Sequence, residues 1–411
     1  MSQSSRCPSA SAEPCSASLC ARDYSPRFPI GHTLHPTFVH TYHLCDELGS
    51  GGYGFVMTAL HRIEDVEVAV KFIIKEKVPE QAWVEDETYG RLPMEVMLLS
   101  MIDHENIVRC LDIFEDELFF YLVQELHGSP WCKRVKSRAA HKHPSPEISI
   151  PQPSSSPPLL SPSASEVSMA DSEPDTPPQT SDQLCSPSIH VQITEISLND
   201  NRIHPGTSSS DEKSHPSLEL PARPYYSRRP SYDLFECIEQ TKHKRLSEKL
   251  ARYIMAQVVD AVYYLDSHGI SHRDIKDENL VIDTNFKVKL IDFGSATIVS
   301  TSEPRPYYKL FFGTSAYAAA EVLLKKPYQA APAEVWTLGI LMSYLLTGMS
   351  PFPMEKDAIE GRVVLSEVPG KNLSHACLHL MSRCLEPDPT LRADIKEVRD
   401  HCWLQGALDD L

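Results

Sequence analysis

His272-Arg-Asp-Ile-Lys-Asp-Glu-Asn279 (HRDIKDEN) and the Asp292-Phe-Gly294 (DFG) that follows it are the two stretches that decide the fold of this 411-residue chain. Each stretch is rare by chance, and the two stand in a fixed order at a short spacing. Their carboxylate and amide groups are hard oxygen donors of the kind that Mg²⁺ prefers. Any one of these residues alone would be read as an ordinary surface charge, but their joint order indicates a site for phosphate chemistry.

A glycine-rich segment, Gly49-Ser-Gly51-Gly-Tyr-Gly54-Phe-Val56, lies far upstream. It fits the pattern G-x-G-x-x-G-x-V, in which glycines let backbone N–H groups approach phosphate oxygens. A dinucleotide-binding interpretation needs a helix directly after the glycines, whereas a strand pattern and then Val68-Ala-Val-Lys71 follow here. The order therefore favours the nucleotide site of a kinase.

Together these motifs resemble the eukaryotic protein kinases of the serine/threonine type, from about residue 42 to residue 404. The resemblance implies an α+β, bilobal protein kinase fold, with a small antiparallel β lobe that carries one main helix and a mainly helical large lobe. Helical spacing at residues 92–101 and 250–269 agrees with it. The five strands expected in the small lobe are Tyr42–Leu48, Phe55–His61, Val66–Lys75, Val108–Phe114 and Leu118–Leu126.

Composition divides the chain into five parts. The stretch after Gly128 is dominated by Ser, Pro and scattered charge, and it cannot bury enough apolar surface to offset the entropy of ordering. The parts expected are a disordered leader at 1–38, the small lobe and hinge at 39–128, a disordered Ser/Pro-rich insert at 129–229, the large lobe at 230–406 and a tail at 407–411.

Charge and apolar content exclude several classes of protein. The net charge of −17 opposes non-specific binding to nucleic acid, and no apolar run approaches the roughly 20 residues that cross a bilayer. The 11 cysteines form no C-x-x-C pair, so neither a disulfide framework nor structural zinc is expected. We expect a monomer in the cytoplasm, with the nucleus as an additional location, and neither nucleic acid nor membrane as a partner.

The resemblance assigns the catalytic residues position by position. Lys71 would hold the α- and β-phosphates and pair with Glu95, which lies in the helix predicted at 92–101. Asp274 would accept the proton of the substrate hydroxyl, and Lys276 would lie beside the γ-phosphate. Because phosphoryl transfer depends on positioning and charge stabilisation, this short set of residues is sufficient.

The cofactors implied are ATP and Mg²⁺. Asn279 and Asp292 would be the metal ligands. The hinge from Glu125 to His127 would bond the adenine edge through its backbone, with Gln124 as the gatekeeper behind it. The remaining residues expected at the nucleotide are Gly49, Gly51, Gly54, Val56, Ala69, Asp233 and Leu280.

Other positions bear on the protein substrate. Lys276 and Thr314 favour transfer to serine and threonine. Asp233 and Glu278 match positions that, in relatives preferring basic substrates, contact an arginine upstream of the acceptor. The alternative, which we weigh equally, is that Asp233 binds the ribose of ATP and Glu278 is a surface residue. Ser231, which follows Arg-Arg-Pro, is either a phosphorylation site or a helix-capping serine, and the second is commoner for so short a motif.

The insert carries Ser-Pro and Thr-Pro pairs that proline-directed kinases would recognise. Several phosphates there would make it strongly anionic. Deletion of residues 135–222 is nonetheless expected to leave catalysis intact. The phosphoacceptors of these pairs are Ser145, Ser156, Ser161, Thr176 and Ser186.

The activation segment departs from the family pattern at Leu310, where many relatives carry a threonine whose phosphate engages the catalytic-loop arginine. Arg273 therefore lacks its usual phosphate partner, and we expect activity without phosphorylation of this segment. Ala320 replaces the proline of A-P-E, while Glu321 is still expected to pair with Arg392.

Glu334 stands where most kinases have aspartate. With HRDIKDENLVID and KLIDFGSA, it makes the chain look most similar to the kinase domains of the PAS-domain-regulated kinases and their fungal relatives. Two other functions are less favoured. A pseudokinase scaffold conflicts with the complete set of catalytic residues, and a kinase of small molecules conflicts with the peptide-binding pattern at Gly313-Thr314.

Overall fold

The computed structural model describes residues 20–87, 90–128, 232–299, 301, 304–365 and 372–409. The expected insert at 129–229, its Ser-Pro and Thr-Pro pairs, and Ser231 therefore lie outside the described residues, as do residues 1–19. Within these ranges, no helix combines the length and the apolar composition needed to span a membrane.

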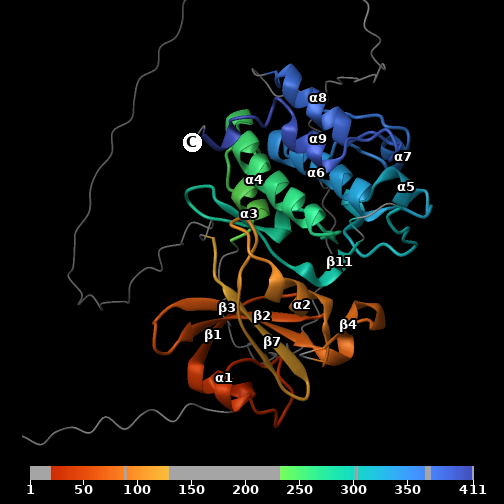
Figure 1. Cartoon of the computed structure of the whole chain (residues 1–411). Helices are drawn as coiled ribbons and strands as arrows, with labels where there is room; N and C mark the ends of the chain where they lie inside the picture. Colours follow the sequence, from red (N-terminus) through yellow and green to blue (C-terminus); the bar gives the residue numbers. More distant parts are fainter. Residues whose placement is uncertain are drawn as a thin grey trace, which may run out of the picture. The chain divides into compact units, whose positions relative to one another are not determined.

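A five-stranded antiparallel sheet forms the small lobe, as predicted (Figure 1). Its strand order is β1-β2-β3-β7-β6. A Cβ atom on Gly54 would come within 1.9 Å of the Phe72 carbonyl oxygen, so glycine is what lets the start of β2 pair with β3. The strands are β1 (Tyr42–Ser50), β2 (Gly54–His61), β3 (Glu67–Ile74), β6 (Cys110–Glu115) and β7 (Phe119–Glu125).

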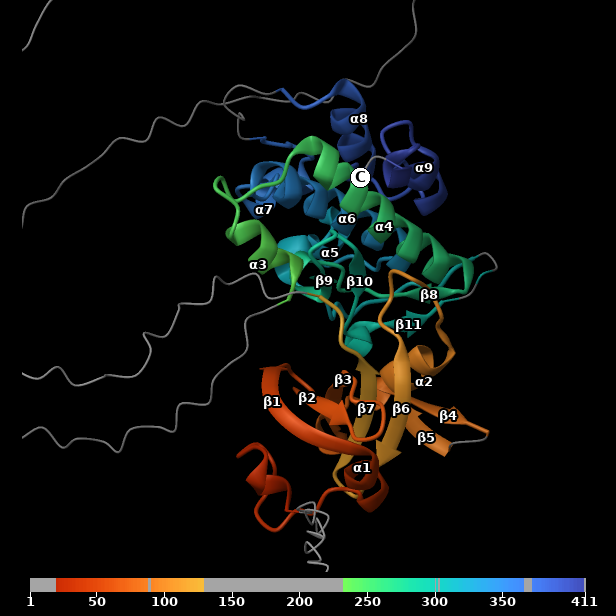
Figure 2. The same cartoon turned by 90° about the vertical axis from the view of Figure 1, so that its left-hand side faces the viewer.

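A hairpin of β4 (Trp83–Asp86) and β5 (Gly90–Pro93) leads into helix α2 (Met94–Met101), and its strands project beside β6 (Figure 2). The helix confirms the prediction at 92–101 except for residues 92 and 93, which end β5. The hairpin was not predicted, because each of its strands has only four residues. The Arg91 guanidinium lies 4.8 Å from the centre of the Trp83 ring and holds the two strands together.

The predicted disordered leader at 1–38 is wrong for residues 20–38. The 3-10 helix η1 (Ala21–Asp23) and helix α1 (Pro36–Thr41) frame a segment that buries Phe28 and Phe38. The Phe28 ring centre lies 5.0 Å from that of Phe72 on β3. These rings show no regular period, so the sequence pattern did not reveal them. The segment that carries them runs beside the sheet (Figure 1), and the rings pack on its aromatic face.

The large lobe is mainly helical, as predicted. Helix α4 begins at the predicted pattern, where the Ser247 side chain accepts a hydrogen bond from the Leu250 N–H, and it ends before Gly269, whose φ is 68°. The helices are α3 (Leu234–Glu239), α4 (Glu248–Ser267), α5 (Ala320–Leu323), α6 (Ala330–Thr347), α7 (Glu355–Ile359), α8 (His375–Cys384) and α9 (Ile395–Asp400).

Four short strands in two antiparallel pairs flank the residues expected to be catalytic. The catalytic loop lies between β8 and β9, and the DFG residues follow β10. The strands are β8 (Ile270–Ser271), β9 (Leu280–Ile282), β10 (Val288–Leu290) and β11 (Thr297–Ile298), and they pair as β9 with β10 and β8 with β11.

One continuous apolar core runs from α2 into the large lobe. Leu99 of α2 and Phe293 of the DFG stretch are both buried in it. The His272 ring packs edge-on against Phe293, with 4.8 Å between the ring centres. This packing fixes the catalytic loop and the DFG stretch against α2.

Candidate active site

Lys71 joins three elements at the centre of the site. Its Nζ lies 2.5 Å from Glu95 Oε1 on α2 and 2.8 Å from Asp292 Oδ1 in the DFG stretch. The Lys71 and Glu95 side chains are almost fully buried, whereas the Asp292 side chain is 48% exposed. The expected pairing of Lys71 with Glu95 is present, and Asp292 keeps an open side toward solvent.

The charges of this trio support one another. The Lys71 ammonium lowers the pKa of Asp292 to about 2 and outweighs the partial burial of that carboxyl, which acts in the opposite direction. Burial by itself lowers the pKa of Lys71, but Asp292 and Glu95 outweigh it and raise that pKa above its ordinary value. Burial also raises the pKa of Glu95, an effect that Lys71 opposes. The ammonium and the Asp292 carboxylate are therefore both charged at neutral pH.

Asp274 is held by the segment that carries Thr314. The backbone N–H and the hydroxyl of Thr314 donate to Asp274 Oδ1 over 2.9 and 2.8 Å. Lys276 Nζ lies 2.8 Å from the Thr314 hydroxyl and 3.3 Å from Asp274 Oδ2. The three residues therefore form one hydrogen-bonded group, which places a carboxylate and an ammonium side by side.

Asn279 and Asp292 lie on adjoining backbone. The Ile291 N–H donates to the Asn279 carbonyl over 3.0 Å. The Asn279 amide nitrogen donates to Asp274 Oδ2 over 3.0 Å, which turns its side-chain oxygen away from that carboxylate. Among the described residues, no group of three His, Cys, Asp or Glu side chains is placed to hold a metal. One amide oxygen and one ionised carboxylate nevertheless fit Mg²⁺, which takes few protein ligands and completes its shell with phosphate and water.

The expected nucleotide residues lie on the strands around this centre. Gly49 pairs with Val56 across β1 and β2, and Val56 pairs with Lys71 across β2 and β3. The loop between Gly51 and Gly54 is closed by a hydrogen bond from the Gly51 N–H to the Gly54 carbonyl, of 2.9 Å.

The expected hinge is attached to β10 through its side chains. Glu125 Oε1 lies 2.8 Å from Lys289 Nζ and also accepts the Arg109 N–H over 2.8 Å. His127 Nε2 lies 2.9 Å from the Lys287 carbonyl oxygen. These contacts were not predicted, and they leave the hinge backbone as the part that would meet a nucleotide.

The wall behind the hinge is formed by Ala69 and Gln124, which pair across β3 and β7. Gln124 is buried, and its amide nitrogen has no hydrogen-bond partner among the described residues. Leu280, also expected at the nucleotide, is fully buried at the start of β9.

Arg273 is surrounded by aromatic rings. Its guanidinium lies 5.4 Å from the centre of the Tyr308 ring and 5.2 Å from that of Phe312, and its Nε donates to the Ser295 carbonyl over 2.6 Å. Backbone hydrogen bonds join Tyr308 to Tyr328 in both directions. Sequence reasoning missed this cluster, although the aromatic residues on either side of Leu310 were the available signal.

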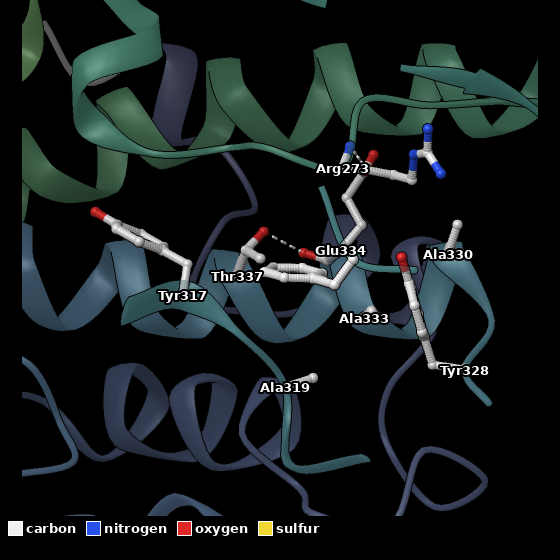
Figure 3. Close-up of a pocket in the computed structure, with 9 residues that line it drawn as sticks. Arg273, Tyr317, Ala319, Tyr328, Ala330, Ala333, Glu334 and Thr337 are labelled. Atoms are coloured by element: carbon white, nitrogen blue, oxygen red, sulfur yellow. Dashed lines mark hydrogen bonds between the residues drawn. The ribbon is translucent and has the colours of Figure 1, made fainter. Parts of the chain in front are cut away.

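A small pocket lies between the catalytic loop and α6, and Figure 3 shows Glu334 reaching from α6 to the backbone of Arg273. The Arg273 N–H donates to Glu334 Oε2 over 2.8 Å, and the Thr337 hydroxyl donates to the Glu334 carbonyl over 2.7 Å. Burial raises the pKa of Glu334 to about 7. The longer side chain at this position thus reaches the catalytic loop.

The end of the activation segment is fixed by a buried ion pair. The Arg392 guanidinium makes two hydrogen bonds to the carboxylate of Glu321, of 3.0 and 2.8 Å. This confirms the predicted pair and shows that alanine at position 320 is compatible with it.

The residues predicted to meet the protein substrate lie around the catalytic loop. The Asp233 side chain caps α3 by accepting the Glu236 N–H over 2.8 Å, and the Asp233 backbone bridges to Val281. Glu278 is 57% exposed and lies 3.2 Å from Lys276 Nζ. Asp233 thus takes part in a helix cap, and Glu278 offers a carboxylate to solvent beside Lys276.

The sequence is similar to known proteins over most of its length. A model described as the protein kinase domain matches residues 42–145 and 226–404. The PAS domain-containing serine/threonine-protein kinase of Mus musculus is 30% identical over 365 residues, which cover 89% of this chain and 18% of that protein.

Two further relatives show the same kind of match. Serine/threonine-protein kinase PSK1 of Saccharomyces cerevisiae is 25% identical over 387 residues, covering 92% of this chain and 20% of that protein. Serine/threonine-protein kinase pim-2 of Danio rerio is 35% identical over 198 residues, covering 47% of this chain and 61% of that protein. The chain therefore spans about a fifth of the length of the mouse and yeast proteins.

Proposed function

Because the chain belongs to the protein kinase family, we propose that it is an active serine/threonine kinase, which transfers the γ-phosphoryl group of ATP to hydroxyl groups of proteins in a signalling role. The chain is similar to PAS-domain-regulated kinases and their fungal relatives, as its matches to the mouse and yeast proteins show. We propose the enzymatic activity, the substrates and the partners of this chain on the basis of that similarity and of the residues in its site.

The observation that carries the proposal is the Lys71 ammonium held between Glu95 and Asp292, at 2.5 and 2.8 Å. In protein kinases the pairing of this lysine with the glutamate of the small-lobe helix, together with a DFG aspartate in position, marks a site ready for catalysis. A chain that serves only as a scaffold has no need of this arrangement.

The residues divide the work of phosphoryl transfer. Lys71 would bind the α- and β-phosphates, beneath the backbone N–H groups of the glycine-rich loop. Asn279 and Asp292 would hold Mg²⁺, which when bound neutralises charge on the phosphates. Asp274 would orient the substrate hydroxyl and take its proton, while Lys276 would face the γ-phosphate.

A transfer assay tests the proposal. Purified protein with Mg-ATP and a mixture of serine and threonine peptides is expected to label the peptides, and Asp274→Asn is expected to lower the rate at least about a hundred-fold because proton acceptance is lost. Both proteins should bind ATP with similar affinity, because Asp274 does not hold the nucleotide. Absence of transfer by the wild type would favour a scaffold.

We also propose a preference for basic residues upstream of the acceptor. The exposed Glu278 carboxylate and the Asp233 backbone bridge to Val281 support it, because both place acidic residues near the catalytic loop. An arrayed peptide library should show selection for arginine three residues before the acceptor. Glu278→Gln should weaken that selection, and an unchanged pattern would leave Glu278 as a surface residue.

We propose further that activity does not require a phosphate on the activation segment. The two rings around the Arg273 guanidinium and the backbone pairing of Tyr308 with Tyr328 support this, because they provide contacts that a phosphate provides in many relatives. Phosphatase-treated protein is expected to keep its rate. A collapse of the rate after treatment would contradict the proposal.

For the setting of the protein, we propose a monomer in the cytoplasm and the nucleus, and an insert that proline-directed kinases phosphorylate. The proposals on location and oligomeric state rest on the composition of the sequence alone, and the proposal on phosphorylation rests on the Ser-Pro and Thr-Pro pairs. Imaging of a fluorescent fusion, light scattering and phosphopeptide mapping would test them in turn.

A further inference from the structure

A buried acid of the catalytic loop is not used by the chemistry described above. Asp277 follows Lys276 directly and begins the 3-10 helix η4 (Asp277–Asn279), yet only 7% of it is exposed. Its Oδ1 accepts a hydrogen bond from the Tyr317 hydroxyl over 2.9 Å, and Tyr317 is buried as well. Burying a carboxyl group is costly unless it is hydrogen-bonded, so the Tyr317 hydroxyl stabilises Asp277 in its buried position.

The contact is the second of two parallel connections between the same two segments. Thr314 is bonded to Asp274, and Tyr317 is bonded to Asp277; each pair is separated by 40 residues along the chain. The bond between Thr314 and Asp274 holds the activation segment at one point. The bond between Tyr317 and Asp277 lies three residues further along both segments, so it also limits rotation of the activation segment about that point. Together they set the position of residues 314–317 relative to the catalytic carboxylate.

The neighbours of Tyr317 make this second connection rigid. The Tyr317 ring lies against that of Tyr344 on α6, with 5.5 Å between the ring centres. Figure 3 shows the Tyr317 hydroxyl pointing away from Arg273 and Glu334, so it serves a contact separate from the Glu334 pocket. Burial raises the pKa of Asp277, and the hydrogen bond from Tyr317 opposes that rise.

Between the two connections, Ser315 and Ala316 are exposed. Because Thr314 is bonded to Asp274, these two exposed residues lie beside the place where a peptide would present its hydroxyl. Resting on the proposed kinase function, we propose that Asp277, acting through Tyr317, is a positioning residue that shapes the surface binding the protein substrate next to the acceptor. Neither Asp277 nor Tyr317 is among the residues expected at the nucleotide or at the reacting hydroxyl.

Steady-state kinetics with separate peptide and ATP titrations test this inference. Tyr317→Phe, which removes only the hydroxyl, is expected to raise the peptide KM about ten-fold, the effect of losing one hydrogen bond to a charged group. The ATP KM and the slow hydrolysis of ATP without peptide should stay within about two-fold of the wild type, since Lys71 and Asp292 are untouched.

Replacements of Asp277 add a conservative rescue. Asp277→Ala should raise the peptide KM as Tyr317→Phe does, whereas Asp277→Asn keeps an acceptor oxygen and should restore most of the affinity for peptide. The double replacement of Asp277 by Ala and Tyr317 by Phe should be no worse than Asp277→Ala alone, because one interaction is removed in each case.

Tyr121→Phe is the matched control, because Tyr121 also donates to a carboxylate, that of Asp116, from a buried position in the small lobe. It should lower the melting temperature without raising the peptide KM selectively. An unchanged peptide KM in Tyr317→Phe, or an equal loss in the peptide and ATP constants, would overturn the inference while the kinase function stands. A wild type that transfers no phosphate would overturn the proposed function itself, and the inference with it.

Discussion

At the scale of single residues, burial and nearby charge decide which groups of the site are ionised. Lys71 and Asp292 stabilise each other's charged forms, and the pKa of Asp292 falls to about 2. At Glu334 burial outweighs the hydrogen bond and the charge of Arg273, and it raises the pKa to about 7. Two acids that both face the catalytic loop thus respond to pH in opposite ways.

The Glu334 carboxyl is expected to make the protein less stable as pH rises. Its pKa goes from 4.5 in the unfolded chain to about 7 in the folded one, so between these values the unfolded chain has released a proton that the folded chain retains. The free energy of unfolding should fall by up to about 3 kcal/mol across that window.

Urea unfolding at about pH 5.5 and about pH 8 would measure this effect in the wild type and in Glu334→Gln, which cannot titrate. The wild type should lose more stability over the rise in pH than the variant. The same change in both proteins would show that Glu334 titrates at its ordinary pKa.

At the scale of elements, two sets of buried contacts stabilise the sheet and the helices around the site. The N-terminal segment of residues 20–41 covers the face of the small-lobe sheet with Phe28 and Phe38. The buried pair of Glu321 and Arg392 joins α5 to the segment that precedes α9. Each set of contacts can be tested by a substitution with a matched control.

Phe28→Ala should lower the free energy of unfolding by about 3–5 kcal/mol, because it leaves a cavity among the rings of Phe55, Phe72 and Phe119. Ile30→Ala is the control from the same segment, since Ile30 is 87% exposed and should change stability little. Denaturant unfolding of both variants checks the prediction, and similar small losses would mean that residues 20–41 do not stabilise the sheet.

Arg392→Ala should lower the free energy of unfolding by about 3–5 kcal/mol, because it leaves the buried Glu321 carboxylate without its partner. Arg383→Ala breaks the partly exposed pair with Glu397 and should lower it by about 1 kcal/mol or less. Calorimetry of the two variants checks this difference, and equal losses would contradict the role of the buried pair.

How much could be predicted differs between elements. The five strands, α2 and α4 follow local periodicity, and the catalytic residues follow motifs, so both were predictable. The aromatic cluster around Arg273 and the cover formed by residues 20–38 were not, because they depend on which faces meet after folding. The contact of Asp277 with Tyr317 was missed for the same reason.

At the scale of the whole molecule, the described chain leaves the hinge at Gly128 and returns at Tyr232. These two residues lie against each other, since a Cβ atom on Gly128 would come within 2.7 Å of the Tyr232 Cβ. A short connection would therefore join them as readily as a long one.

Deletion of residues 135–222 is expected to leave kcat and both KM values within about two-fold of the wild type, because Gly128 and Tyr232, which the shortened connection would join, lie close together. Kinetics of the deleted protein check this, with its melting curve as a measure of folding. Loss of activity in a folded deletion protein would show that the stretch takes part in catalysis or substrate binding.

The most direct test of the central claim is the rate of phosphoryl transfer to an arrayed peptide library with Mg-ATP, for the wild type beside Asp292→Asn. If Lys71, Glu95 and Asp292 form a working phosphate and metal site, the wild type will label serine and threonine peptides and the variant will not. A folded wild type that labels no peptide at saturating ATP, or a variant as active as the wild type, would contradict the account.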